Sequence, residues 1–161
     1  MNYGRITNCY ATGYISARTN AGGIYSLAGL VGKNYYNGTI TDCYTACYIS
    51  SSHPWDVDGL VGINDGTIDS TSFWNRTTTG TSTSDSGTGI PADVMRMLST
   101  FTDAPASWDF KNTWQMQDGL TFPYLHIGIG GPPPVEGDLN GDGGVDFNDF
   151  RIISNNWLAG K

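Results

Sequence analysis

The sequence predicts an all-β fold in which short strands stack into a β-solenoid, also called a β-helix. The first observation behind this prediction is an internal repeat, because residues 4–16 recur 34 positions later as residues 38–50 with most positions identical. The second is the chemistry of the repeat, which is rich in Thr, Ile, Val and Tyr, is punctuated by Gly and Asn, and lacks helical apolar spacing. Repeats of this length are typical of units that bury their apolar faces by stacking on one another.

A further part of the repeat supports the same fold. The Gly-Leu-Val-Gly of residues 29–32 returns at residues 59–62, and a third Gly-Thr-Ile begins at Gly66. Each Gly-Leu-Val-Gly is expected to form a strand, each Asn-x-Gly a turn that tolerates positive φ, and each Thr-Ile-Thr-x-Cys-Tyr the next strand. Tyr-Ile-Ser then begins a third side. Residues 1–74 are therefore predicted to form three-sided coils.

Composition narrows the classes of partner. The chain of 161 residues has 22 Gly and only 14% charged residues, which suits a turn-rich β protein. Its formal net charge is -7 and its Lys and Arg residues are scattered singly, so no basic stripe is present to bind phosphates. No apolar run is long enough to span a bilayer. We therefore expect neither nucleic-acid binding nor membrane insertion.

The beginning of the chain bears on localisation. It starts in mid-repeat. It lacks the basic segment followed by an apolar run that is typical of a secretion signal. We therefore expect it to be the tail of a larger secreted protein, or a mature chain that has lost its signal. The predicted localisation is extracellular or at the cell surface.

The three cysteines, Cys9, Cys43 and Cys47, are too few for a disulfide scaffold and have no zinc-ligand spacing. Cys9 and Cys43 occupy the same position in two repeats, which predicts stacked core thiols. Neighbouring strands lie about 4.8 Å apart, so a disulfide between these two remains an alternative.

Loops between the repeat strands are the expected place for binding, because loops on a rigid scaffold vary without disturbing it. Four aromatic residues in these loops are candidates for contact with sugar rings: Tyr25, Tyr35, Tyr36 and Trp55. The alternative is that they pack over the corners of the coil.

Residues 75–127 are predicted to be a capping segment that covers the exposed end of the strand stack. Pro91 is a helix-start signal, and the apolar residues from Val94 to Phe101 predict a short amphipathic helix. Large apolar side chains follow at Trp108, Phe110, Trp114, Phe122, Tyr124 and Leu125. A ligand pocket lined by these aromatic residues is the alternative to a cap.

The succession of Gly-Leu-Val-Gly-x-Asn, Gly-Thr-Ile and Asp/Asn-Cys-Tyr resembles the GLUG-motif repeats of bacterial cell-surface and secreted proteins. The resemblance extends from residue 1 to about 127, because residues 72–75, the Ser/Thr/Gly tract of residues 80–89 and the aromatic clusters are similar to the segment that closes many such arrays. It implies a β-helical, adhesin-like architecture and implies no defined activity.

Residues 128–136 form a predicted Gly/Pro linker, and residues 137–161 a small acidic unit. Its side chains follow the spacing of a calcium loop, with oxygen ligands at the first, third and fifth positions, Gly143 at the sixth and an acid at the twelfth. The predicted ligands are Asp138, Asn140, Asp142, Gly144 through its carbonyl, Asp146 and Asp149. Ca²⁺ suits this set because it accepts six to eight oxygens. An acidic turn without metal is the alternative.

The acidic unit also resembles a single dockerin repeat, since Asp149 stands at the twelfth position and a helical pattern follows over residues 150–158. Dockerins that bind cohesin carry two such units, so a cohesin-type partner is not expected here.

The predicted function is a non-catalytic, calcium-stabilised extracellular protein for adhesion or surface display, whose partner is a cell-surface or glycan ligand. One alternative is self-assembly, in which copies join head to tail into a fibre. A second alternative is a polysaccharide-binding or polysaccharide-cleaving protein. Cleavage needs clustered acids, and the repeat strands offer only Asp42 and Asp69 with Arg5 and Lys33, so no catalytic residue is predicted.

Overall fold

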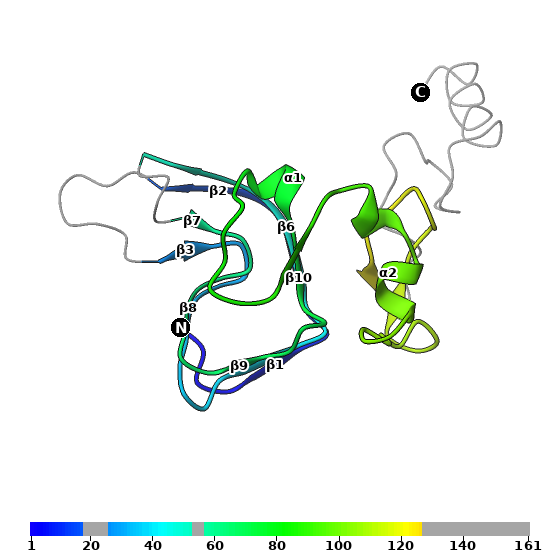
Figure 1. The fold of residues 1–161 in the computed structure, drawn as a ribbon, viewed down its shortest axis with the longest axis horizontal. Coiled ribbons are helices and arrows are strands. Elements are labelled where there is room, and N and C mark those ends of the chain that lie inside the picture. Colours follow the sequence, from blue (N-terminus) through cyan, green and yellow to red (C-terminus); the bar gives the residue numbers. More distant parts are fainter. Residues whose placement is uncertain (18–25, 53–56, 127–161) are drawn as a thin grey trace, which may run out of the picture.

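The computed structural model describes residues 1–17, 26–52 and 57–126, and this part of the chain consists mostly of short strands (Figure 1). The strands are β1 (Arg5–Thr7), β2 (Tyr10–Ala17), β3 (Leu27–Ala28), β4 (Val31–Asn34), β5 (Thr39–Thr41), β6 (Tyr44–Ser51), β7 (Val57–Asp58), β8 (Val61–Asn64), β9 (Thr67–Ile68), β10 (Phe73–Asn75), β11 (Thr88–Ile90), β12 (Trp114–Gln115) and β13 (Tyr124–Leu125). The helices are α1 (Arg76–Thr79), the 3-10 turn η2 (Val94–Arg96) and α2 (Ser99–Thr102).

Equivalent strands of the repeat pair in parallel. β2 and β6 pair along their whole length, from Tyr10 opposite Tyr44 to Ala17 opposite Ser51. β1 pairs with β5 in the same register, and β5 pairs with β9. β3 pairs with β7 and β4 with β8. Many identical side chains, such as those of Tyr10 and Tyr44, therefore stand above one another in neighbouring strands, which accounts for the sequence repeat.

The prediction of a β-solenoid is wrong. The strands form separate sheets, with strand orders β1-β5-β9, β11-β10-β6-β2, β12-β13, β3-β7 and β4-β8, and none of these sheets is closed. The physical reason is that most strands are only two to four residues long and each stack is only two to four strands deep. Each sheet is therefore small, and the strands do not form a closed or continuous solenoid.

An apolar cluster fills the space between the repeat strands. Its buried members are Val31, Ile40, Cys43, Leu60, Val61 and Trp74. The glycine of Gly-Leu-Val-Gly is required here, because a Cβ on Gly59 would overlap the Trp74 ring. Close packing of this kind leaves no room for a larger residue.

A ladder of asparagines joins three levels of the stack. Asn34 is fully buried, and its Oδ1 accepts a hydrogen bond from Asn2 Nδ2 at 2.8 Å. Its Nδ2 donates to Asn64 Oδ1 at 2.8 Å and to the carbonyl of Gly38 at 3.2 Å. A Cβ on Gly38 would overlap Asn34 Oδ1, so the Asn-x-x-x-Gly spacing of this turn serves the ladder.

The turn before β2 and the turn before β6 share an unusual backbone conformation. Asn8 and Asp42 occupy it with φ of 51° and 52°. Asn and Asp are among the side chains that best tolerate this left-handed region. The Asn/Asp alternation between repeats is therefore explained by backbone geometry.

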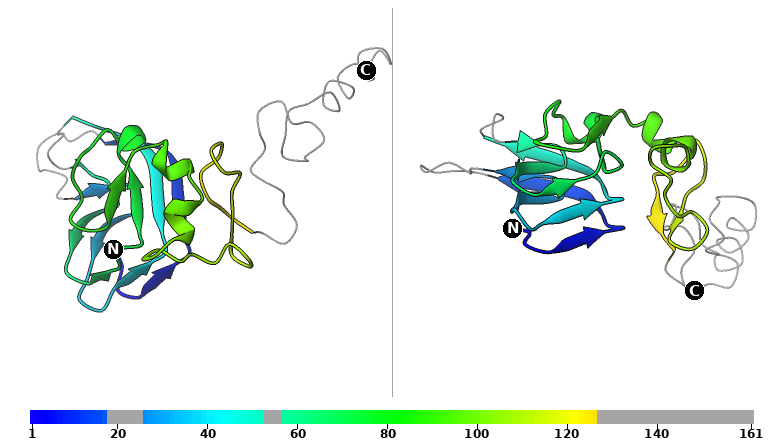
Figure 2. Two further views of the ribbon diagram at one scale, coloured as in Figure 1. Left: turned by 45° about the vertical axis from the view of Figure 1, so that its right-hand side comes forward. Right: turned by 60° about the horizontal axis from the view of Figure 1, so that its bottom comes forward.

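The cap lies beside the stacked strands, against the outer face of the four-stranded sheet (Figure 2). Tyr44, Ala46 and Phe73 of the sheet share one buried cluster with Met95, Phe101, Ala106, Trp108 and Trp114 of the cap. Two tryptophans of the cap donate hydrogen bonds to different repeats. Trp114 Nε1 donates to Asn8 Oδ1 at 3.3 Å, and Trp108 Nε1 donates to the Thr71 carbonyl at 3.0 Å. The helix expected after Pro91 is divided into η2 and α2.

The Ser/Thr/Gly tract crosses the upper level of the stack and is held there by hydrogen bonds. The amide of Gly59 donates to the Thr83 carbonyl at 2.8 Å, and Ser84 Oγ accepts from the amides of Leu60 and Val61, each at 3.1 Å. This tract therefore covers the turn between β7 and β8 and the start of β8 through backbone and side-chain hydrogen bonds.

Candidate functional site

Two exposed tyrosines form a stacked pair on the outer face of the four-stranded sheet, outside the area that the cap covers. Tyr14 of β2 and Tyr48 of β6 lie with ring centroids 5.4 Å apart and an interplanar angle of 11°. They are 66% and 56% exposed. Side chains at alternate positions of a strand share a face, so they stand on the same face as Tyr10 and Tyr44, which the cap contacts.

The local fold leaves a space beside this pair. β10 pairs with β6 only at Tyr44 and Thr45, and the chain then turns into α1. Asn75 ends β10 and caps α1, because its Oδ1 accepts from the amides of Thr77 and Thr78. Gly80 ends the helix with φ of 71°. β10 therefore does not continue along β6 beside Tyr48.

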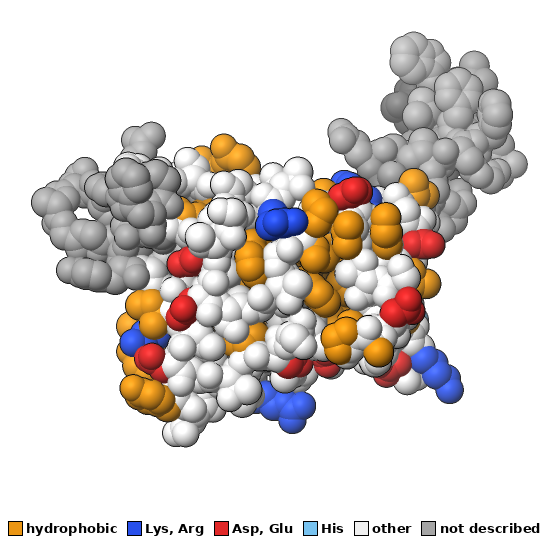
Figure 3. Space-filling view, in the orientation of Figure 1, with side chains coloured by type: hydrophobic (Ala, Val, Ile, Leu, Met, Phe, Trp, Pro, Cys, Tyr) orange, Lys and Arg blue, Asp and Glu red, His pale blue; other side chains and the backbone are white. Residues whose placement is uncertain are grey.

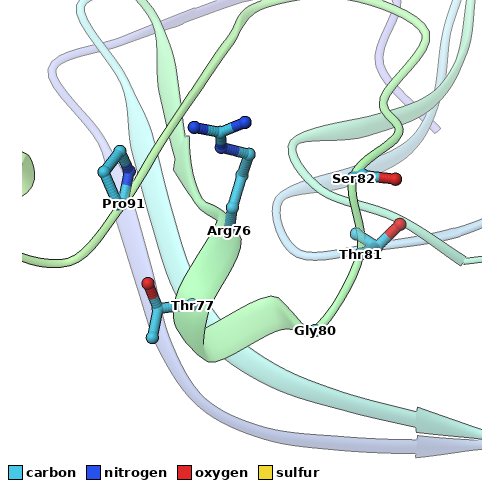
Figure 4. A pocket seen from close by; sticks show the side chains of 6 residues that line it. All are labelled: Arg76, Thr77, Gly80, Thr81, Ser82 and Pro91. Atoms are coloured by element: carbon cyan, nitrogen blue, oxygen red, sulfur yellow. The ribbon is translucent and has the colours of Figure 1, made fainter.

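Two hollows lie on either side of residues 80 and 81. The smaller, of about 220 Å³, is lined by Tyr48, Ile49, Ser50, Ser51, Val57, Thr79, Gly80 and Thr81. The larger, of about 450 Å³, is open and is lined by Arg76, Thr77, Gly80, Thr81, Ser82 and Pro91 (Figure 4). Arg76 stands between Pro91 and the segment that carries Thr81 and Ser82. Both hollows are shallow sites rich in hydroxyl groups.

The charges near these hollows are few. No charged side chain lines the smaller hollow, and Arg76 is the charged residue of the larger one. Within the described ranges the ion pair is Lys33 with Asp65, at 3.0 Å, so Arg76 has no carboxylate partner there. On the face shown in Figure 3, acidic and basic side chains are scattered and do not gather into a patch.

Two of the four predicted contact aromatics lie in the described ranges, in the turn between β4 and β5. Tyr35 stacks on Tyr3 with ring centroids 4.3 Å apart, and the Lys33 ammonium lies 4.7 Å from its centroid. Its ring is therefore already engaged. Tyr36 is 81% exposed. Tyr25 and Trp55 lie outside the described residues, so the predicted platform of four is not tested.

The predicted calcium ligands Asp138, Asn140, Asp142, Gly144, Asp146 and Asp149 all lie outside the described residues. Within residues 1–17, 26–52 and 57–126, His, Cys, Asp and Glu form no group of three that could hold a metal ion. The calcium site therefore stays a prediction from the sequence.

The acid and the thiol of the repeated Asp-Cys-Tyr sequence are engaged in packing. Asp42 Oδ1 accepts from Thr71 Oγ1 at 3.0 Å, and partial burial raises the pKa of its carboxyl. Cys43 is fully buried, which raises the pKa of its thiol to about 12. Cys9, Cys43 and Cys47 are free cysteines, so the alternative of a disulfide is not observed. Asp42 and Cys43 therefore have the environment of structural residues.

Thiol labelling should show this burial. In the native protein at pH 8, iodoacetamide is expected to modify Cys9, which is partly exposed, far faster than Cys43. With a pKa of about 12, only about one Cys43 thiol in ten thousand is ionised at that pH, and the thiolate is the reactive species. Mass spectrometry of digested protein measures the labelling. In urea all three cysteines should react, and fast native labelling of Cys43 would contradict the prediction.

Comparison with known proteins gives one partial match. The chain is 32% identical over 117 residues, or 70% of its length, to a protein of Evansella cellulosilytica named "Putative Gly-rich membrane protein". It spans 13% of the length of that relative. No protein-family model matches the chain, and no solved structure matches it. In the described part of the chain, no helix is long and apolar enough to cross a membrane. The GLUG resemblance is not tested by these comparisons.

Sequence reasoning missed Tyr14 and Tyr48 because it treated the repeat strands as scaffold and sought binding residues in loops. The sequence nevertheless contains a pattern that indicates them. Tyr10 and Tyr14 are four residues apart, which places them on one strand face, and both tyrosines recur in the second repeat. In the structure, Trp114 of the cap contacts Tyr10 and Tyr44, and Tyr14 and Tyr48 stay exposed.

Proposed function

We propose that this chain is a non-catalytic, calcium-stabilised module of an extracellular protein that serves in adhesion or surface display. The observation that supports this proposal most is the exposed stack of Tyr14 and Tyr48 on a sheet of in-register strands. Aromatic side chains that are held rigidly at a surface provide contact area at a small cost in conformational entropy.

The arrangement around this stack favours binding over catalysis. The sheet presents uncharged side chains, and the hollows beside it are lined by hydroxyl groups, one arginine and apolar residues. Asp42 and Asp69, which directly follow the repeat strands β5 and β9, accept hydrogen bonds from Thr71 and Ser72. These contacts support a structural role for both carboxylates.

An adhesion assay tests the proposed function. Beads coated with the full chain are expected to adhere to intact bacterial cells or to polysaccharide-coated surfaces more strongly than beads coated with albumin. The same protein should release no soluble reducing sugar from these surfaces. Adhesion equal to that of albumin on every surface, or release of sugar, would overturn the proposal.

One observation favours fibre formation as a second candidate. β2 lies at the edge of its sheet, is eight residues long, and contains neither a charged residue nor a proline. Long uncharged edges of this kind tend to pair with another strand. Analytical ultracentrifugation of the full chain over a hundredfold range of concentration tests this function. A growing mass supports a fibre, and a constant monomer mass contradicts it.

The calcium part of the proposal rests on the oxygen-rich spacing of residues 138–149, whose carboxylate and amide groups suit Ca²⁺. Isothermal titration of the full chain with CaCl₂ is expected to show one site. Asp142→Asn should weaken it by about tenfold or more, because it removes one of the ligand charges that set the affinity. The matched control is Asp93→Asn, at an exposed residue of the cap, which should bind like the wild type. Absence of binding by the wild type would refute a metal loop.

A further inference from the structure

The first repeat has an open edge, which is the side of β1 and β2 that faces away from β5 and β6. Both strands stand at the end of their sheets, and β1, in dark blue, lies at one end of the stack (Figure 2). The Cys9 carbonyl accepts a hydrogen bond from the Tyr44 amide, so the odd-numbered residues of β2 direct their backbone groups toward β6. Backbone groups alternate in direction along a strand. The even-numbered residues of β2 therefore present amides and carbonyls at the open edge, where no described strand pairs with them.

The apolar core is less covered at this edge than in the middle of the stack. Ile40 and Cys43 of the second repeat are fully buried. Their counterparts Ile6 and Cys9 pack against the same cluster but are only partly buried. The second repeat has strands on both of its sides, whereas the first repeat has a described strand on one side only. A further strand with apolar residues at these positions would bury the remaining surface.

The ladder of asparagines can accept one more member at this edge. Asn64 Oδ1 accepts from Asn34 Nδ2 at 2.8 Å and from the Gly66 amide at 3.3 Å. Asn2 Oδ1 accepts from the Gly4 amide at 3.0 Å in the same way, but among the described residues it accepts from no asparagine. An amide oxygen has two lone pairs, so Asn2 can still accept from an asparagine Nδ2. The bonds of the ladder all run in one direction, which requires an added strand to be parallel.

The rows of threonines and tyrosines can be extended at the same edge. Thr41 Oγ1 donates to Thr7 Oγ1 at 2.9 Å, so the Thr7 hydroxyl keeps its own hydrogen for a threonine on the other side. Tyr14 stacks on Tyr48 with nearly parallel rings and is 66% exposed. A tyrosine at the same position of an added strand would continue this stack, since side chains directly opposite each other in a sheet interact.

We propose that the open edge binds a parallel strand of the same repeat from another polypeptide, with the sequence pattern of residues 34–51. The asparagine of this strand lies next to Asn2, its Thr-Ile-Thr next to β1 and its Tyr-x-x-x-Tyr-Ile-Ser next to β2. This inference rests on the assembly function proposed above as the second candidate, and it names the sequence and the direction of the partner strand. An unrelated extended segment matches only the backbone, so it should bind more weakly.

The test titrates the full chain with a peptide of residues 34–51 that carries Cys43→Ala and Cys47→Ala. Isothermal titration and amide chemical shifts follow the binding. The peptide is expected to bind and to shift the amides of the even-numbered residues of β2, and a scrambled peptide should not bind. A nitroxide at the peptide N-terminus should broaden amides near Asn2, and a nitroxide at its C-terminus should broaden amides near Ala17, because the proposed strand is parallel and in register.

Thr12→Pro in the full chain is designed to block the open edge. The Thr12 amide points away from β6, and proline is tolerated at such positions of edge strands. Proline removes one hydrogen-bond donor and adds bulk at the edge, so peptide binding should weaken by about tenfold or more, with the fold checked by circular dichroism. Thr12→Ala keeps the amide and should bind within about twofold of the wild type. Asn34→Ala in the peptide leaves the protein unchanged and should weaken binding by about fivefold, because it removes the donor to Asn2.

Four results would overturn the proposal: no binding of the repeat peptide, equal binding of the scrambled peptide, exchange of the two nitroxide effects, or unchanged binding in the folded Thr12→Pro variant. Ultracentrifugation separates this site from the wider assembly. If the full chain grows in mass and Thr12→Pro grows equally, assembly stands and the proposed edge is wrong. If the full chain stays a monomer but binds the repeat peptide, fibre formation fails and the edge site stands.

Discussion

Replacing Trp114 by alanine is expected to lower the free energy of unfolding by about 3–5 kcal/mol, the range for a large buried aromatic residue. Trp114 is fully buried, and its ring contacts Tyr10, Tyr44 and Trp108. Its loss leaves a cavity between the cap and the sheet, and it removes the hydrogen bond to Asn8. Urea unfolding followed by circular dichroism measures the change.

Leu120→Ala is the matched control for this prediction. Leu120 belongs to the same cap but is 72% exposed, so its truncation should change the free energy of unfolding by less than about 0.5 kcal/mol. If Trp114→Ala were as stable as Leu120→Ala, the cap would not be packed against the strands in solution.

Replacing Asn34 by alanine is the second change with a large expected effect, about 2–4 kcal/mol of lost stability. The substitution removes three hydrogen bonds at a fully buried position. It also leaves Asn2 Nδ2, Asn64 Oδ1 and the Gly38 carbonyl without these partners, and each polar group that stays buried and unpaired costs about 1–3 kcal/mol. Thermal unfolding by calorimetry or urea unfolding measures the loss.

The control here is Asn37→Ala, an exposed asparagine in the turn that follows Asn34. It should stay close to the wild type, because surface substitutions of this kind change stability by about 0.5 kcal/mol or less. Equal stability of the two variants would show that the ladder of asparagines does not join the levels of the stack.

The register of the strands could be read from the sequence. Identical residues at a spacing of 34 indicate that the two repeats stack in register, and the structure pairs Tyr10 with Tyr44 and Ile15 with Ile49. The reason is physical. In-register stacking places like side chains together on both faces of a sheet, and a slip by one residue would turn the apolar face outward.

The arrangement of the strands into sheets could not be predicted from the sequence in the same way. The sequence shows that repeats exist, but the depth of each stack depends on where a strand gives way to another conformation. After Asn75 the chain forms α1, because Asn75 caps the helix and Gly80 ends it. This local choice ends the third strand of the row after two residue pairs with β6. The strands form separate sheets in place of the predicted β-solenoid.

The sequence by itself determined the repeat and its register, the mostly strand character, and the oxygen-rich loop of the acidic tail, since each is a matter of spacing along the chain. Only the tertiary structure decided which tyrosines are covered. One face of the sheet carries Tyr10, Tyr14, Tyr44 and Tyr48. Tyr44 is buried because the cap packs against it, whereas Tyr48 lies outside the area that the cap covers and is exposed. The extent of a cap depends on packing between residues far apart in sequence, here Trp114 with Tyr10 and Tyr44. No local sequence pattern encodes how far the cap extends over the sheet.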